Sequence, residues 1–449
     1  MPMNASSLKT RTVRKVSRRV LPFFFLLYVI SYLDRANVSF AKISMSADLG
    51  FSEAVYGFGA GVFFVGYFLL EIPGALIVER WSARLWLSRI LITWGLCTIW
   101  VGFVRTPTQF YVARFCLGLA EAGFFPGVLV YLARWFPKQD RARAMSKFIL
   151  AVPISLVIGA PLSALLLSLH WFGLPGWTWV FVLQGVPAII CGIVTPFCLP
   201  DHPRDAGWLH PAERAWLEDT LLEEKEWKRS QNNVTVGQAF RDRTTWLLSA
   251  ALLFAIFGSY GFILWLPATI HNASGFSQIA STLLSALPFA GAAVCLIWMG
   301  RSSDRTGRRK LHTAIPLFAA GVFFACVTIP NQPFPLQMFW LFLSGSMLWA
   351  WTPSFWVLPT LSLGESAAAA ALGLINSIGN LGGFFGPTLV GYLLSNQRSH
   401  AFTTGILCLA FGLSGTLVLV TPMPEDRGAQ PVPSKEDLPG LVAGDVTRT

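Results

Sequence analysis

Twelve mostly apolar stretches of about 20 residues follow one another along this chain. A helix needs about 20 such residues to cross a hydrocarbon core of about 30 Å, and a segment in lipid must satisfy its own backbone hydrogen bonds. The pattern predicts an all-α integral membrane protein with twelve transmembrane helices. The expected spans are 20–40, 54–78, 86–104, 108–133, 144–168, 177–199, 245–268, 278–299, 311–329, 336–360, 368–394 and 401–421.

The composition excludes an ordinary soluble enzyme. Of the 449 residues 54% are hydrophobic and only 13% are charged, whereas about 25% are charged in soluble domains. The net charge of +11 would favour nucleic-acid binding in a soluble chain, but here we expect the lipid bilayer as partner and no nucleic acid. The seven cysteines lie in apolar stretches without C-x-x-C spacing, so we expect no metal and no cofactor.

The polar stretch 200–244 separates six spans from six others and is predicted to be a cytoplasmic linker, in which Pro211 could start a surface helix. A weak repeat supports this division, since a shift of 227 residues aligns GAPL with GPTL, at 159–162 and 386–389. Parallel repeats predict a binding site at their interface. The expected domains are a tail 1–19, a six-helix half 20–199, the linker 200–244, a second half 245–421 and a tail 422–449.

The distribution of Lys and Arg predicts the orientation. With a cytoplasmic N-terminus, 29 of the 34 basic residues lie in cytoplasmic segments and three lie outside, as the positive-inside rule requires. Both termini are therefore expected in the cytoplasm, and the chain in a bacterial plasma (inner) membrane as a multi-pass protein. Asp34 and Arg35 within the first span argue against a cleaved signal peptide.

Five ionisable residues inside the first four spans predict a site. A charge in hydrocarbon costs about 2.5–3.5 kcal/mol on insertion scales, so such residues usually face a cavity and find partners. Arg114 and Glu121 are seven residues apart and share a helix face, while Asp34 and Arg114 lie at similar depth and are expected to approach each other in at least one state. Asp34 and Glu121 are expected to form a proton relay. Glu71 is either a helix-packing or a gating residue.

A guanidinium facing a water-filled space can hold a carboxylate by two parallel hydrogen bonds, so Arg114 predicts an organic anion as substrate. The second half lacks equivalent charges, because the repeat places Leu341 at the position of Arg114 and Leu348 at that of Glu121. Its candidate lining residues are polar or aromatic: Tyr260, Trp351, Ser354, Trp356, Asn376 and Asn380.

Two segments with mixed charges, GALIVERWSAR and GRSSDRTGRRK, follow spans 2 and 8. They satisfy the positive-inside topology, and we also expect them to form a charge clasp that breaks when the halves rock. The gating candidates are Glu79, Arg80, Asp304, Arg305 and Arg308.

The chain resembles the major facilitator superfamily up to about residue 421, because GRSSDRTGRRK is similar to its signature loop and GALIVERWSAR is a degenerate copy. The segments YLDRANVS, GYFLLEIPG, RFCLGLAEAGFFPG and RWFPKQDRARA resemble its anion:cation symporter family, and YGFILWLPATI resembles the tartrate-transporter branch. The resemblance implies protonation at Asp34 and Glu121. It also implies substrate or coupling roles for Tyr32, Arg35, Tyr67, Arg114 and an asparagine of span 11, either Asn376 or Asn380.

These observations predict a monomeric, proton-coupled secondary transporter that imports a small organic acid anion by alternating access. A tartrate-like hydroxydicarboxylate is the first candidate for its substrate. Span 5 is apolar around Val152, where sugar-acid members of the family carry glutamine, which argues against a sugar acid. An importer of an aromatic monocarboxylate such as hydroxyphenylacetate and a proton-driven drug exporter are the alternatives. A membrane sensor would need a signalling domain, and an enzyme would need a metal, nucleophile or phosphate motif.

Overall fold

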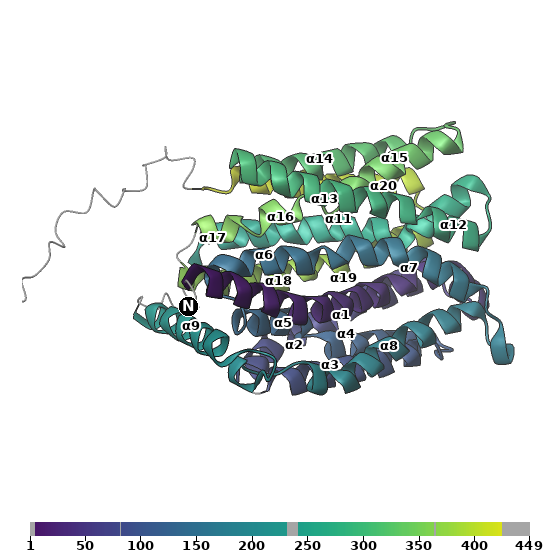
Figure 1. Cartoon of the computed structure of the whole chain (residues 1–449). Helices are drawn as coiled ribbons and strands as arrows, with labels where there is room; N and C mark the ends of the chain where they lie inside the picture. Colours follow the sequence, from purple (N-terminus) through teal and green to yellow (C-terminus); the bar gives the residue numbers. More distant parts are fainter. Residues whose placement is uncertain (1–4, 81, 231–240, 363–364, 424–449) are drawn as a thin grey trace, which may run out of the picture.

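The computed structural model describes residues 5–80, 82–230, 241–362 and 365–423, and the regular secondary structure in this part of the chain is entirely helical. Long helices lie side by side with similar axis directions (Figure 1). The first bundle comprises α1 (Ala5–Leu49), α2 (Glu53–Arg80), α3 (Ala83–Val101), α4 (Pro107–Glu121), α5 (Phe124–Ala133), α6 (Lys138–Ile149), α7 (Ala151–Leu167), the 3-10 turn η1 (Trp171–Gly173) and α8 (Gly176–Cys198).

A connecting segment with the 3-10 turn η2 (Pro203–Asp205) and helix α9 (Pro211–Ser230) follows the first bundle. The second bundle comprises α11 (Arg243–Ser274), α12 (Gln278–Leu284), α13 (Ala286–Thr306), α14 (Arg309–Val327), α15 (Phe334–Met347), α16 (Thr352–Phe355), α17 (Leu358–Ser362), α18 (Glu365–Asn380), α19 (Gly382–Ser395) and α20 (His400–Val420).

By length and composition, nine helical stretches of the described residues could cross a membrane, and they match nine of the twelve expected spans. The span expected at 86–104 forms α3, whose Arg84 and Arg89 lower its mean hydropathy. The spans expected at 336–360 and 368–394 are not continuous helices. Nine of the expected spans are therefore confirmed as apolar helical stretches, the span at 86–104 is a helix of lower hydropathy, and those at 336–360 and 368–394 each contain more than one helix.

Proline and glycine lie at the boundaries between helices in the spans expected at 336–360 and 368–394. Pro353 and Pro359 are the second residues of α16 and α17, a position where a residue without an amide hydrogen is tolerated but cannot continue a preceding helix. The boundary between α18 and α19 lies among Gly379, Gly382 and Gly383. Leu381, between the two helices, keeps right-handed helical dihedral angles, with φ at −62° and ψ at −22°.

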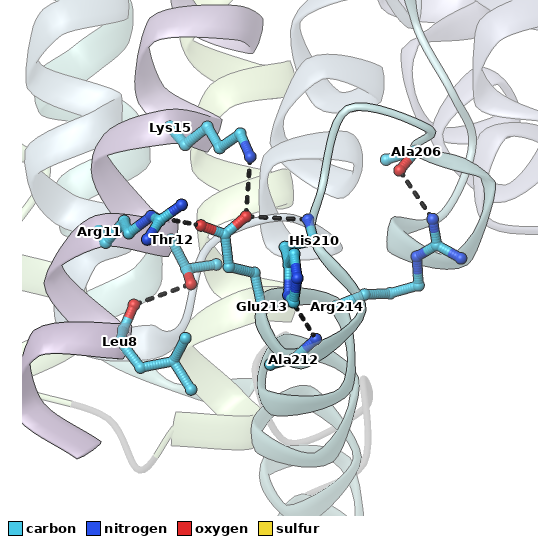
Figure 2. A network of polar contacts seen from close by, with 9 residues as sticks. All are labelled: Leu8, Arg11, Thr12, Lys15, Ala206, His210, Ala212, Glu213 and Arg214. Atoms are coloured by element: carbon cyan, nitrogen blue, oxygen red, sulfur yellow. Dashed lines mark hydrogen bonds and ion pairs between the residues drawn. The ribbon is translucent and has the colours of Figure 1, made fainter. Parts of the chain in front are cut away.

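The linker helix begins at Pro211, which confirms the predicted start. It docks on α1, which begins at Ala5, so the described part of the basic tail is a helix continuous with the first span. The buried carboxylate of Glu213 pairs with Arg11 Nε at 3.0 Å and Lys15 Nζ at 2.9 Å (Figure 2). Burial alone raises the pKa of the Glu213 carboxyl, but hydrogen bonds from Lys15 and the His210 amide and the nearby positive charges outweigh it and lower the pKa. The carboxylate is therefore charged at neutral pH.

The two bundles meet closely at the end remote from α9. The Tyr56 hydroxyl donates to the Leu264 carbonyl at 3.1 Å, and Trp265 Nε1 donates to Glu53 Oε2 at 2.8 Å. Gly57 of α2 lies against Gly391 of α19, where an added Cβ would come within 2.9 Å of the Gly391 Cα. Glycine at this point permits backbone contact, which brings the ends of α2 and α19 together and encloses the middle of the molecule from this side.

Candidate functional site

An ion pair between Arg35 of α1 and Glu121 of α4 lies in the middle of the first bundle. Arg35 Nη2 is 2.7 Å and Nε 2.8 Å from Glu121 Oε1, which also accepts a 2.8 Å hydrogen bond from the Ser31 hydroxyl. The Glu121 side chain is fully buried and that of Arg35 is 10% exposed. The second oxygen, Oε2, is buried without a hydrogen-bond partner in the described structure. Glu121 therefore has one oxygen held by donors and one that is available for a further hydrogen bond.

A break in the helix sets the position of Glu121. Glu121 is the last residue of α4, and Gly123 has a φ of +85° before α5 begins. This left-handed conformation favours glycine, and an added Cβ at Gly123 would lie 3.0 Å from the Gly74 Cα. The sequence AEAG thus ends α4 at the carboxylate and lets α2 approach.

Asp34 has neutral donors as partners. Asn37 Nδ2 donates to Asp34 Oδ1 at 2.8 Å, and Trp94 Nε1 of α3 donates to Oδ2 at 2.9 Å. Asp34 is 1% exposed. No ion pair joins Asp34 to Arg114 in the described structure, although the two charges are near enough to interact electrostatically.

Arg114 is 2% exposed, yet much of its hydrogen-bonding capacity is unused. Its Nη2 donates to the Ala60 carbonyl at 3.3 Å, whereas Nε and Nη1 are buried without a partner among the described residues. Buried donors are normally paired because an unpaired one costs about 1–3 kcal/mol or more when charged. The guanidinium is therefore prepared for an additional acceptor.

Phe63 of α2 lies beside both arginines. Its ring centroid is 5.6 Å from Arg35 Cζ and 5.0 Å from Arg114 Cζ. A ring within about 6 Å of a cation attracts it through its negative face. Phe63 therefore connects the Arg35–Glu121 pair to Arg114, so that the two guanidinium groups belong to one cluster.

Aromatic side chains surround Arg35 and reach the second bundle. Arg35 Cζ lies 4.9 Å from the Tyr67 ring and 5.3 Å from the Tyr32 ring. The Tyr32 ring packs edge-on against Trp349 with centroids 5.9 Å apart, and Tyr260 packs against Phe64 in the same manner at 4.5 Å. The three expected tyrosines thus lie where the two bundles meet.

Other residues predicted in the second half have different surroundings. Trp351 Nε1 donates to the Leu348 carbonyl at 2.7 Å, so it stabilises its own helix break. Ser354 is fully buried and its hydroxyl has no partner within the described structure. Trp356 is half-buried and packs against Phe355.

Glu71 joins the two bundles. It is 4% exposed and accepts hydrogen bonds from Asn376 Nδ2 and, at 3.1 Å, from the Ser377 hydroxyl, both on α18. Asn380, one turn further along, is also oriented toward this carboxylate. Asn376 is therefore occupied by a residue of α2 in this conformation, and Glu71 is an interface residue.

The predicted charge clasp is only partly visible. Asp304 pairs with Arg309 at 2.6 Å next to its own loop, and Arg305 and Arg308 are exposed. The side chains of Glu79 and Arg80 lie outside the described residues.

The sequence reasoning did not identify Ser31, Asn37, Phe63, Trp94 and Trp349. One signal was available, since Ser31 precedes Arg35 by one helical turn and the repeat aligns it with Ser259. Asn37 likewise follows Asp34 by three residues. Nothing in the sequence separates Trp94 or Trp349 from the other 16 tryptophans.

Comparison with known proteins gives a coherent result. A family model described as Major Facilitator Superfamily matches residues 24–387. A protein of Agrobacterium vitis named "Putative tartrate transporter" is 40% identical over 429 residues, which cover 94% of this chain and 98% of the relative. A "Quinolone resistance transporter" of Acinetobacter baumannii is 37% identical over 415 residues, covering 91% and 94%.

Among solved structures, the inward open conformation of the xylose transporter XylE from E. coli matches with a TM-score of 0.70 and 14% identity. The match covers 91% of this chain and 97% of that chain. At this identity the likeness shows the fold alone.

The contact between Glu71 and Ser377 predicts energetic coupling between the bundles. Unfolding in mixed micelles of Glu71→Gln, Ser377→Ala and the double variant should give a coupling free energy of about 1 kcal/mol, in the range measured for polar contacts between membrane helices. The matched control combines Glu71→Gln with Ser344→Ala, since the buried Ser344 hydroxyl donates to Ala320 instead. Additive effects for Glu71 and Ser377, as in the control, would contradict the contact.

Proposed function

The chain belongs to the major facilitator superfamily, and from this premise we propose that it imports a small organic acid anion together with protons. It is a multi-pass membrane protein and a secondary transporter of small solutes, not an enzyme. The substrate class, the coupling ion and the direction of transport are the proposed part. A tartrate-like hydroxydicarboxylate is the first candidate, and the name of the 40% identical relative favours it.

The observation that carries the proposal is Arg114, with two buried guanidinium nitrogens that lack a partner in the described chain. Each of these nitrogens can donate a charge-assisted hydrogen bond to a carboxylate oxygen, and Nη1 together with Nη2 presents the parallel pair of donors that a carboxylate favours. Removing an unpaired charge from water is expensive, and an opposite charge compensates part of that cost. An anionic solute therefore gains more at this position than a neutral or cationic solute.

Two cations on one aromatic ring favour a substrate with two carboxylates. Arg35 and Arg114 both lie beside Phe63, so the second carboxylate could reach Arg35 when Glu121 releases it. Protonation of Glu121 would remove the charge that holds Arg35. This sequence of events would couple proton uptake to anion binding, with Asp34 as the second proton site.

An aromatic monocarboxylate remains the alternative for an importer. The rings of Tyr32, Tyr67, Tyr260 and Trp349 near the two arginines support it, because pocket walls for aromatic ligands are commonly aromatic. The buried Ser354 hydroxyl would instead serve a hydroxylated substrate.

We extend the proposal to the topology. The interrupted helices α15–α17 and α18–α19 would each complete one crossing, as broken helices do in many transporters. Twelve crossings would then place both termini and the linker 200–244 in the cytoplasm, with halves 20–199 and 245–421 alternating around the site in a monomer. Glu71 and its partners on α18 would close one side of that site, with Asp304 and the loop arginines at its cytoplasmic rim.

Proton-driven export is a second candidate function. The 37% identical relative named for quinolone resistance favours it. The same fold and the same proton site would serve either direction, so only a transport measurement separates the two.

The proposal is tested with purified protein in liposomes and a panel of radiolabelled acids that includes tartrate and hydroxyphenylacetate. We expect one acid to accumulate only with a proton gradient directed into the vesicle lumen. Equilibration without gradient dependence would contradict proton coupling. Gradient-driven movement of a quinolone, with no movement of any acid in the panel, would favour export.

Glu121→Gln separates proton coupling from binding. The amide can still accept from Ser31 and Arg35, but it carries no exchangeable carboxyl proton. We expect the gradient-driven accumulation ratio to fall to about one, while exchange of internal for external substrate continues. Glu226→Gln in the linker, an exposed carboxylate, is the matched control and should behave as wild type. Undiminished accumulation by Glu121→Gln would exclude this carboxylate as the coupling site.

Arg114→Lys tests carboxylate recognition. Lysine keeps the charge but cannot present two parallel N–H donors, and hydrogen bonds to charged groups contribute about 1.5–3 kcal/mol. The Kd for the transported acid should therefore rise at least tenfold in a binding titration. Arg105→Lys, at an exposed loop arginine, should leave the Kd unchanged. Equal Kd values for Arg114→Lys and wild type would remove the basis for two-point recognition.

A further inference from the structure

A strongly basic pocket lies between α1 and α6, at the end of the molecule where α9 docks. Its volume is about 600 Å³. Lys9, Arg14 and Arg18 of α1 and Arg143 and Lys147 of α6 line it, and Asp140 is the one acidic residue in the lining. Arg14 and Arg18 also line a neighbouring pocket of about 1010 Å³ on the other side of α1. The transport site described above uses none of these residues.

The cations are arranged in two columns that face each other. Arg14 and Arg18 are four residues apart on α1, and Arg143 and Lys147 are four residues apart on α6. Like charges at this spacing destabilise a helix, and the facing column adds to the repulsion. All four side chains are exposed, and none has a hydrogen-bond or ion-pair partner in the described residues. An anion bound from outside the chain would relieve this repulsion.

On the adjacent face of α1, a residue of the protein itself supplies the negative charge that neutralises the basic side chains. Arg11 and Lys15, also four residues apart, both pair with Glu213 of the linker helix (Figure 2). The connecting segment thus supplies a carboxylate to one face of α1, and the face toward α6 receives none. The difference between the two faces indicates an external ligand on the second.

The pocket is amphipathic along α1. Toward the apolar part of the helix its lining changes from Arg18 to Leu21, Pro22 and Phe25. Leu26, the next residue, is 47% exposed. A free phosphate would use only the cationic part, whereas a lipid would place its headgroup among the cations and its acyl chains along the apolar residues.

We propose that this pocket between α1 and α6 binds the phosphate headgroup of an anionic phospholipid. The guanidinium groups of Arg18 and Arg143 hold the phosphate oxygens, for which two-point contacts are geometrically favoured. Pro22 and Leu26, one turn apart on α1, lie along the acyl chains. The site is independent of the transported solute and would exist for an importer or an exporter.

Native mass spectrometry of the full chain with defined lipids tests the proposal. We expect the wild type to retain phosphatidylglycerol in preference to phosphatidylcholine. In Arg18→Gln/Arg143→Gln the Kd for phosphatidylglycerol should rise about 25-fold, since each basic residue at an anionic membrane surface contributes roughly fivefold. Arg18→Lys/Arg143→Lys keeps both charges but loses the two-point contacts, so its Kd should lie between those of the wild type and the glutamine variant, which excludes misfolding as the cause.

The matched control removes two exposed cations from the connecting segment, Arg204→Gln/Lys225→Gln, and should leave the Kd unchanged. An equal loss in the control would show that net charge alone attracts the lipid and would overturn the proposal. Equal retention of the two lipids by the wild type would do the same. Displacement of the lipid by millimolar inorganic phosphate would identify a free-anion site instead.

Discussion

The free-energy cost of burying a charge without a partner determines how the ionisable residues at the centre of this molecule are arranged. Five ionisable side chains lie within the apolar spans of the first half, and each has at least one hydrogen-bond or ion-pair partner. Glu121 has Arg35 and Ser31, Asp34 has Asn37 and Trp94, and Glu71 has donors on α18. Arg114 differs, since two of its buried nitrogens lack partners in the described structure. Most of these buried charges are thus satisfied within the protein, and Arg114 keeps the donors that the proposed anionic solute would use.

The fold could be predicted almost entirely from hydropathy. Nine of the twelve expected spans are apolar helices, and the linker helix begins at the proline where it was expected. The errors have local causes. Average hydropathy along the chain does not register that Pro353 and Pro359 lie at the start of new helices, or that α18 ends before α19 begins. It also treats the basic tail as polar and unstructured, although ion pairs with Glu213 and packing against α6 support a helix from Ala5.

The candidate site could be predicted in part. Charged residues are rare in apolar segments, so candidate site residues among them can be recognised from the sequence alone. This applies to Asp34, Arg35, Glu71, Arg114 and Glu121. Their pairing could not be predicted. Helical spacing placed Glu121 and Arg114 on one face, but α4 ends at Glu121, and the carboxylate meets Arg35 of α1 instead. Neutral partners such as Trp94 are chosen by three-dimensional packing, and one tryptophan among 18 has no distinguishing sequence.

The arrangement also explains why an anion and a proton would bind together in the proposed mechanism. An anion at Arg114 lies near Arg35, through their common contact with Phe63, and hence near the negative charge of Glu121. Like charges in a region of low dielectric repel strongly, so the anion binds better when Glu121 has taken a proton on its free oxygen. By linkage, the anion must then favour proton uptake by the same factor. Coupling in this form would need no dedicated relay, because the repulsion between the Glu121 carboxylate and a carboxylate of the solute would itself link proton uptake to anion binding.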